Sequence, residues 1–159
     1  MVPAVEAIVD AGMIVVGHIG LTPQTATQLG GYRVQGRTAQ EAQHLLDDAL
    51  ALEQAGASML VLEMVPDRVA KRITQELKIP TIGIGAGAGC DGQVLVLHDL
   101  VGMYDRFTPR FARQYAQLGA QMERALAQYR DEVQSRGFPG PENIFTMDDA
   151  EYDAWTASA

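Results

Sequence analysis

The chain has little cysteine and few positively charged residues, and both features restrict the classes of protein to which it can belong. A single cysteine, Cys90, excludes a disulfide within the chain and fits a reducing compartment, so we expect a cytoplasmic protein. Twelve lysine and arginine residues stand against twenty aspartate and glutamate residues, which gives a formal net charge of −8. This acidity argues against nucleic acid or an anionic membrane surface as a partner.

Long apolar runs and leader patterns are also missing. No run of about 18 apolar residues occurs, so we expect no membrane span, and Pro3, Glu6 and Asp10 interrupt any signal-peptide pattern. The sequence contains no G-x-S-x-G elbow or Walker A motif, and its histidines lack metal-ligand spacing. With 47% apolar and 20% charged residues, the 159-residue chain has the composition of one globular domain rather than a disordered chain.

Strand-like and helix-like segments alternate along the chain. Short apolar runs predict buried strands, and apolar residues with a period of about 3.6 predict helices. The strand segments are 13–18, 59–65 and 79–84, and the helix segments are 5–9, 39–55 and one that begins near 67. This alternation is typical of an α/β protein with a parallel sheet. A complete (β/α)₈ barrel needs eight strands and roughly 200 residues or more, so the chain is either a small open sheet or half of a barrel.

The remaining segments are less regular. Residues 20–38 form a long connection with little periodicity, a feature that is often functional. Val94 to Leu97 predicts a strand or a short buried helix, and a long amphipathic helix is expected from beyond Pro109 to about Arg136. We therefore expect a catalytic domain over 1–145 and an acidic, mobile tail over 146–159.

Glu63 is the first candidate for a chemical role. It lies in the apolar run 59–65, directly before the Met64-Val65-Pro66 turn region. A carboxylate in a buried strand is costly to desolvate unless it has a partner or a function. At the carboxyl end of a strand in an α/β protein that function is usually chemical. We favour an acid/base role for Glu63, with a structural ion pair to a neighbouring arginine as the alternative.

His18 is the second candidate, because it is expected to end its strand as Glu63 ends its own. In a parallel sheet the two side chains would lie at the same rim, although a lone histidine there is more often structural. His44 is expected on the polar face of its helix, and the adjacent His98 and Asp99 would point in different directions.

The glycine-rich segment 83–92 satisfies the dinucleotide pattern G-x-G-x-x-G at Gly87 to Gly92. That chemistry requires a helix N-terminus directly afterwards, whereas an apolar block follows here. We favour instead a tight turn over a substrate or a packed neighbour. Cys90 has no activating base nearby in sequence and is a weak candidate for a nucleophile.

Four motifs resemble hallmarks of the ketopantoate (3-methyl-2-oxobutanoate) hydroxymethyltransferase family. They are GHIGLTPQ at 17–24, GGYRVQGR at 30–37, VLEMVP at 61–66, and IGIGAG at 82–87 followed by DGQ at 91–93. The resemblance runs from about Val5 to Phe145. That family has a (β/α)₈ TIM barrel of the phosphoenolpyruvate/pyruvate class. The resemblance implies that this chain covers its second half, strands five to eight, with His18 ending strand five and Glu63 ending strand six.

The resemblance also implies a reaction. A hydroxymethyl group would pass from 5,10-methylenetetrahydrofolate to 3-methyl-2-oxobutanoate, giving ketopantoate for pantothenate and coenzyme A synthesis. Mg²⁺ would chelate the keto acid and stabilise the enolate charge. Glu63 would be the general acid/base, and His18 would lie near the substrate.

The metal-binding acids and the substrate-binding lysine and serine of that family belong to the first half of the barrel, so no metal ligand is assigned here. A half-barrel leaves two sheet edges and an apolar face uncovered. We therefore expect a homo-oligomer or association with an N-terminal half-barrel. Two alternatives stay open: an inactive fragment that serves only as an association partner, and a related Mg²⁺-dependent carbon–carbon lyase or aldolase of the same barrel class.

Overall fold

The computed structural model describes residues 2–28 and 30–158. The α-helices are α1 (Val2–Asp10), α2 (Ala39–Gln54), α3 (Asp67–Glu76), α4 (Leu97–Leu100), α5 (Leu118–Gln134) and α6 (Asp149–Ala157). The strands are β1 (Val16–Gly20), β2 (Met59–Glu63), β3 (Thr81–Ile84) and β4 (Gly92–Gln93). Two short 3₁₀ helices are η1 (Pro23–Thr25) and η2 (Pro141–Asn143). Among these residues, no helix is both long and apolar enough to cross a membrane.

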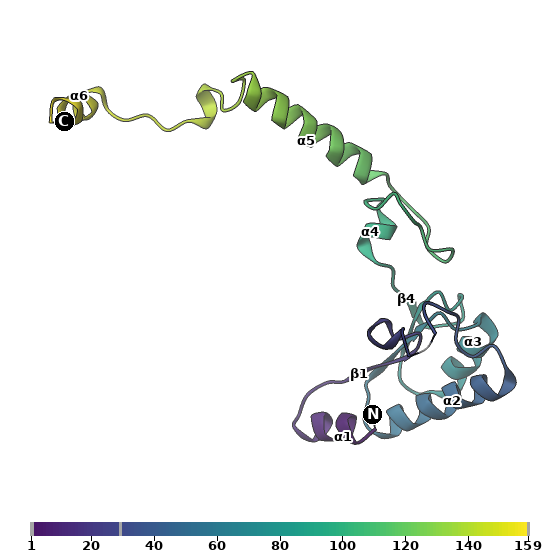
Figure 1. Cartoon of the computed structure of the whole chain (residues 1–159). Coiled ribbons are helices and arrows are strands. Elements are labelled where there is room, and N and C mark those ends of the chain that lie inside the picture. The colour runs from purple at the N-terminus through teal and green to yellow at the C-terminus, as the bar shows by residue number, and fades with distance from the viewer. Residues whose placement is uncertain (1, 29, 159) are drawn as a thin grey trace.

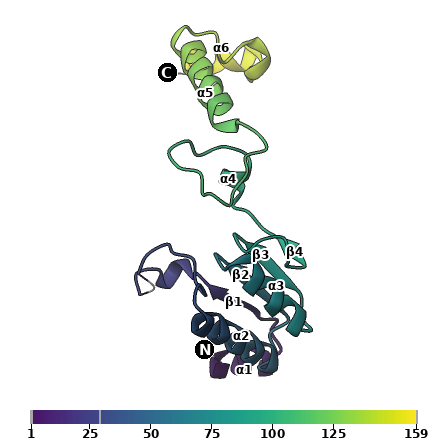
Figure 2. The same cartoon turned by 90° about the vertical axis from the view of Figure 1, so that its right-hand side faces the viewer.

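The strands form one parallel sheet in the order β1-β2-β3-β4. Helices α2 and α3 connect the first three strands, so each of these neighbouring parallel pairs has a helical crossover, as parallel pairing usually requires. The predicted α/β class with a parallel sheet is confirmed. Figures 1 and 2 show this α/β body with the segment α4 to α6 extending away from it.

The core lies between one face of the sheet and helices α2 and α3. Leu60 and Leu62 of β2 are fully buried there, as are Ala49 of α2 and Ala70 and Ile73 of α3. Burying a side chain of leucine size contributes about 1.5–3 kcal/mol. Since side chains alternate along a strand, Met59, Val61 and Glu63 lie on the opposite face, where they are only half-buried. The prediction that this strand is buried on both faces is therefore wrong for one face.

Local sequence explains where the crossover helices begin. The Thr38 side chain accepts a hydrogen bond from the Glu41 backbone N–H, and the Glu41 carboxylate accepts one from the Thr38 backbone N–H, a capping box that starts α2. Helix α3 begins at Asp67, an acidic residue that suits the positive end of a helix dipole. Both starts agree with the predicted helix positions.

Two predicted boundaries were wrong. The first strand runs over 16–20 rather than 13–18, and Ile14 is 84% exposed. His18 therefore lies two residues before the end of its strand. The C-terminal helix begins at Leu118 rather than near Pro109, because residues 109–117 form turns that are tied back to the chain before them. The Tyr115 N–H donates to the Leu100 carbonyl at 2.8 Å, and the Leu118 N–H donates to that of Val101 at 3.0 Å.

The segment after β4 is largely solvent-exposed. Val94, Val96 and Leu97 are exposed, so the expected strand or buried helix at 94–97 was wrong, and a four-residue α4 begins at Leu97 instead. Helix α5 exposes apolar side chains at helical spacing, namely Met122, Leu126, Tyr129 and Val133. The acidic tail forms helix α6, and its mobility stays a prediction. In this structure the predicted 1–145 domain comprises a packed body and an extended arm (Figure 1).

Candidate functional site

The candidate site lies where β1 and β2 end. The register pairs His18 with Val61 and Gly20 with Glu63. Because alternate residues share a face, His18 and Glu63 both lie on the face of the sheet opposite α2 and α3. They are diagonal neighbours on adjacent strands, close enough for side chains of this length to meet.

The two side chains do meet. His18 Nε2 lies 3.1 Å from Glu63 Oε2, and the side chains are 31% and 14% exposed, respectively. The distance is that of an ion pair, but the angles are not those of a hydrogen bond, and buried Nε2 has no hydrogen-bond partner among the described residues. The two atoms are therefore close together but are not hydrogen-bonded to each other. An unpartnered buried nitrogen beside a carboxylate is a position that an incoming polar group can satisfy.

Backbone contacts fix the chain around Glu63. The Glu63 carbonyl accepts a hydrogen bond from the Leu21 N–H at 2.8 Å, and the Met64 N–H donates to the Ile84 carbonyl at 2.9 Å. Gly20, with φ +89°, permits the first contact, since a Cβ there would collide with the Glu63 carbonyl oxygen. The backbone that carries this carboxylate is therefore hydrogen-bonded on both sides, to the end of β1 and to β3.

The glycine-rich segment after β3 packs against a neighbouring helix. Gly87, with φ +78°, lies so close to α3 that a Cβ would come within 2.5 Å of Asp67 Cβ, and Gln93 Nε2 donates to the Gly87 carbonyl at 2.9 Å. The segment leads into strand β4 rather than into a helix. The dinucleotide pattern therefore lacks the helix N-terminus that a pyrophosphate needs, and the favoured interpretation of a tight turn over a packed neighbour is confirmed.

Cys90 and Asp91 belong to a structural network beneath this turn. The Asp91 carboxylate accepts hydrogen bonds from the Thr81 N–H at 2.8 Å and from the Thr81 hydroxyl at 3.1 Å. Burial raises the pKa of the Cys90 thiol and outweighs hydrogen bonds from Thr74 and Thr81 that lower it. A thiol with a raised pKa is a poor nucleophile, which agrees with the low weight given to Cys90 from sequence.

Metal-binding side chains do not gather at the candidate site. Within residues 2–28 and 30–158, no group of three or more histidine, cysteine, aspartate or glutamate side chains is arranged to hold an ion. His44 is exposed on α2 and His98 is exposed on α4, each on a different element from the other candidates. Of the sequence-predicted residues, the structure brings together only His18 and Glu63.

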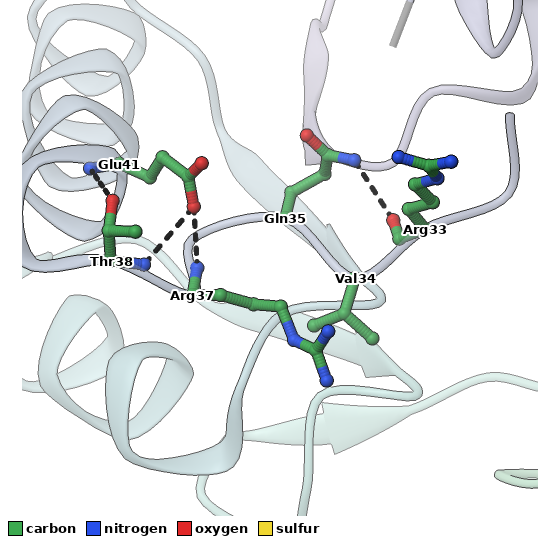
Figure 3. A pocket seen from close by; sticks show the side chains of 6 residues that line it. All are labelled: Arg33, Val34, Gln35, Arg37, Thr38 and Glu41. Atoms are coloured by element: carbon green, nitrogen blue, oxygen red, sulfur yellow. Dashed lines mark hydrogen bonds between the residues drawn. The ribbon is translucent and has the colours of Figure 1, made fainter. Parts of the chain in front are cut away.

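A hollow lies between the end of the 20–38 connection and the first turn of α2, and it is formed by residues that were not selected as site residues from sequence. It measures about 520 Å³ and is lined by Arg33, Val34, Gln35, Arg37, Thr38 and Glu41 (Figure 3). The Gln35 N–H donates to the Met64 carbonyl at 2.9 Å, so the hollow adjoins the residue after Glu63. The signals available from sequence were the long connection 20–38 and, within it, the GGYRVQGR motif at 30–37 that contains both arginines.

Comparisons with known proteins give a consistent family. The sequence profile of ketopantoate hydroxymethyltransferase matches residues 1–141. A 3-methyl-2-oxobutanoate hydroxymethyltransferase of Heliobacterium modesticaldum is 61% identical over 149 residues, covering 94% of this chain and 54% of the relative. Enzymes of the same name from Nitratidesulfovibrio vulgaris and Cenarchaeum symbiosum are 53% and 56% identical, covering 99% and 94% of this chain and 52% and 57% of the relatives.

The chain spans about half the length of the curated relatives that it matches. The profile covers all four motifs, and it includes both His18 and Glu63. On the strength of these matches, the chain belongs to the ketopantoate hydroxymethyltransferase family.

Proposed function

We propose that this chain supplies the Glu63 side of the active site of a 3-methyl-2-oxobutanoate hydroxymethyltransferase. The reaction joins C3 of 3-methyl-2-oxobutanoate to the methylene carbon of 5,10-methylenetetrahydrofolate; water supplies the hydroxyl group, tetrahydrofolate leaves, and ketopantoate is produced. The observation that carries this proposal is the position of Glu63 at the carboxyl end of β2, with His18 Nε2 3.1 Å from its carboxylate. Active sites of (β/α)₈ barrels form at this end of the strands.

The fold favours a half-barrel with strands five to eight of a (β/α)₈ barrel, rather than a complete small domain. The face of the sheet opposite the helices carries Met59, Val61, Ile82 and Ile84, and Val16 at its edge is 52% exposed. Apolar side chains on that face would be covered by the opposing strands in a closed barrel. We propose that an N-terminal half-barrel, or further copies of the chain, cover this face in the cytoplasm.

Glu63 is proposed as the general acid/base. Loss of a proton from C3 of the keto acid leaves an enolate, and a carboxylate within hydrogen-bond reach of that proton can accept it. The same group can return the proton to the departing folate nitrogen. Its low exposure keeps water from competing for the proton, and the adjacent His18 nitrogen would orient the carboxylate or contact a substrate oxygen.

The Mg²⁺ ion implied by the family does not fit the described residues by themselves. Octahedral coordination of Mg²⁺ needs several oxygen ligands, whereas the site offers a single carboxylate with a histidine beside it. We propose that the ligands come from the first half of the barrel, and we derive no step through the ion. When bound, it would supply charge stabilisation to the enolate.

Two other functions remain as alternatives. An inactive half-barrel would serve only to associate with another chain. It would retain the apolar face, and its association would not depend on Glu63. A related carbon–carbon lyase or aldolase would need Glu63 but not folate.

The test is co-expression with the first half of the Heliobacterium modesticaldum relative, followed by assay of the purified pair for ketopantoate. We expect folate-dependent product from the pair and none from the Glu63→Gln pair. Product that is insensitive to Glu63→Gln would reject the proposed role, and a pair that assembles without activity would favour the inactive partner.

A further inference from the structure

Met64, the residue directly after Glu63, has a backbone conformation that a residue with a side chain disfavours. Its φ is +49°, in the left-handed region where a Cβ comes too close to the following carbonyl oxygen. A residue keeps such a conformation only where its surroundings hold it, and residues of this kind gather at functional sites. Contacts from other parts of the chain must therefore hold the turn that leads out of β2.

Both backbone polar groups of Met64 are hydrogen-bonded to other segments. The Met64 N–H donates to the Ile84 carbonyl at 2.9 Å, and the Met64 carbonyl accepts from the Gln35 N–H at 2.9 Å. The first partner ends β3, and the second lies in the connection between β1 and α2. These two hydrogen bonds clamp the residue next to the Glu63 carboxylate from two directions.

The β3 side of this clamp depends on a glycine. The Ile84 carbonyl belongs to the peptide plane that joins Ile84 to Gly85, so the plane turns when the φ angle of Gly85 changes. Gly85 has φ +63°, which is one of many conformations that are open to glycine. Without a restraint on Gly85, rotation there would turn the carbonyl away from the Met64 N–H.

The side chain of Phe111 lies against this glycine. A Cβ on Gly85 would lie 2.9 Å from Phe111 Cδ1 and 3.0 Å from Phe111 Cγ, so the ring covers the glycine backbone. Gly87 and Gly89 of the same segment lie instead against residues of α3. At Gly85, therefore, the extended arm of the chain contacts the end of β3.

Phe111 is carried on a loop that is closed at its base. The Tyr115 N–H donates to the Leu100 carbonyl at 2.8 Å, which brings the two ends of the loop together. Surface loops with ends close together are compact and are frequently functional. Phe111 is 36% exposed, whereas Phe107 on the same loop is 67% exposed. The less exposed of these two phenylalanines is thus the one that lies against the end of β3.

We propose that Phe111 is a positioning residue for Glu63. Its ring restrains Gly85, Gly85 sets the direction of the Ile84 carbonyl, and this carbonyl holds the Met64 backbone next to the carboxylate. The consequence for catalysis rests on the proposed function, whereas the restraint of the backbone does not. The loop between α4 and α5 thereby acts on the candidate site through the backbone at the ends of β2 and β3.

Amide hydrogen exchange, followed by NMR on the full 159-residue chain, tests the restraint. In Phe111→Ala the Met64 amide should exchange about five- to tenfold faster, because loss of the ring weakens its hydrogen bond. The Leu60 N–H donates to the Pro80 carbonyl at the other end of the same strand pair, and its exchange should not change. The matched control Phe107→Ala should alter neither amide.

A second variant and a second amide keep the test decisive. Phe111→Leu keeps an apolar side chain over the glycine and should retain part of the protection of the Met64 amide. An unchanged Met64 amide in Phe111→Ala would overturn the proposal. Equal acceleration of the Met64 and Leu60 amides would also overturn it, since the ring would then stabilise the whole sheet rather than this turn.

The chain paired with its first half tests the consequence for the reaction. We expect Phe111→Ala to lower the rate of C3 proton exchange at saturating keto acid about tenfold, because a small displacement of a catalytic group slows the chemical step. The apparent KM for the keto acid should not change, since the substrate would still bind. Phe111→Leu should recover part of the rate, and Phe107→Ala should keep all of it.

The two measurements separate this inference from the proposed function. Faster exchange of the Met64 amide together with a full rate in the Phe111→Ala pair would reject the positioning role and leave the proposed function intact. Faster exchange of that amide together with keto-acid exchange that is insensitive to Glu63→Gln would support the restraint by Phe111 and reject the proposed function.

Discussion

His18 Nε2 and Glu63 Oε2 lie 3.1 Å apart on adjacent parallel strands, and the histidine nitrogen has no hydrogen-bond partner among the described residues. The pair is formed by diagonal neighbours, one from the third position of β1 and one from the last position of β2. A largely buried carboxylate and a shielded histidine nitrogen therefore share one small region at the end of the sheet.

Replacement of His18 by alanine should impair the assembled enzyme less than loss of Glu63. A neighbour that orients a carboxylate or contacts a substrate oxygen is worth about 10- to 100-fold in rate. Loss of a general acid/base costs about 10²- to 10⁴-fold. Steady-state rates of ketopantoate formation by the chain paired with its first half would measure both.

The matched control is His44→Ala, which removes an exposed histidine from α2. It should leave the rate unchanged. A His18→Ala enzyme as active as the parent would show that the contact with Glu63 has no role in the reaction.

Gly20→Ala should destabilise the fold by about 3 kcal/mol or more. The residue has φ +89°, which costs an alanine about 1–2 kcal/mol, and its Cβ would also collide with the Glu63 carbonyl oxygen. Urea unfolding followed by circular dichroism would give the difference in free energy of unfolding.

Gly12→Ala separates the two causes, because Gly12 has φ +81° but a Cβ added there would meet no atom within 4 Å among the described residues. It should lose only about 1–2 kcal/mol. Equal losses at the two positions would mean that the close approach of β1 to Glu63 contributes nothing to stability.

Alkylation of Cys90 should be slow at neutral pH and should rise with a midpoint above that of an unstructured cysteine. Burial raises the pKa of this thiol, so less thiolate, the reactive form, is present at a given pH. For the same reason the folded state should lose stability relative to the unfolded state as pH rises above the unfolded thiol pKa. Iodoacetamide labelling across about pH 7–10 would give the midpoint, where about 8.5 is the unperturbed value.

The same labelling in concentrated urea provides the reference, since unfolding removes the burial. The midpoint should then return to the ordinary thiol value. A folded-state midpoint below the unfolded one would mean that Thr74 and Thr81 outweigh burial at this site.

Hydrophobic pattern was sufficient to predict the body of the fold. Helices α2 and α3 and strand β2 lie within a residue or two of their predicted positions, because apolar periodicity and capping signals act locally. The hydrophobic pattern did not predict the structure of residues 13–18 and 109–117. Met13 and Ile14 are apolar yet exposed, and Phe111 packs against Gly85 from a turn rather than from a helix, which no local period can predict.

The candidate site was only partly predictable. Strand ends and the cost of a buried carboxylate led to Glu63, and parallel pairing led to its neighbour His18. Residues 33–37 were quoted within a family motif but not selected as site residues, because the approach of their backbone to the residue after β2 depends on the Gln35–Met64 contact. Sequence distance alone does not reveal such a contact in a connection of irregular structure.

Proton–deuterium exchange at C3 of 3-methyl-2-oxobutanoate is the most direct measurement of the proposed role of Glu63. The keto acid would be followed by NMR in D₂O with Mg²⁺, using the chain alone, the chain with its first half, and the same pair carrying Glu63→Gln. We expect exchange from the pair only, lost on substitution of Glu63. Exchange by the isolated chain would refute the proposal that the active site needs the first half of the barrel. Exchange by the Glu63→Gln pair would refute the assignment of Glu63 as the base.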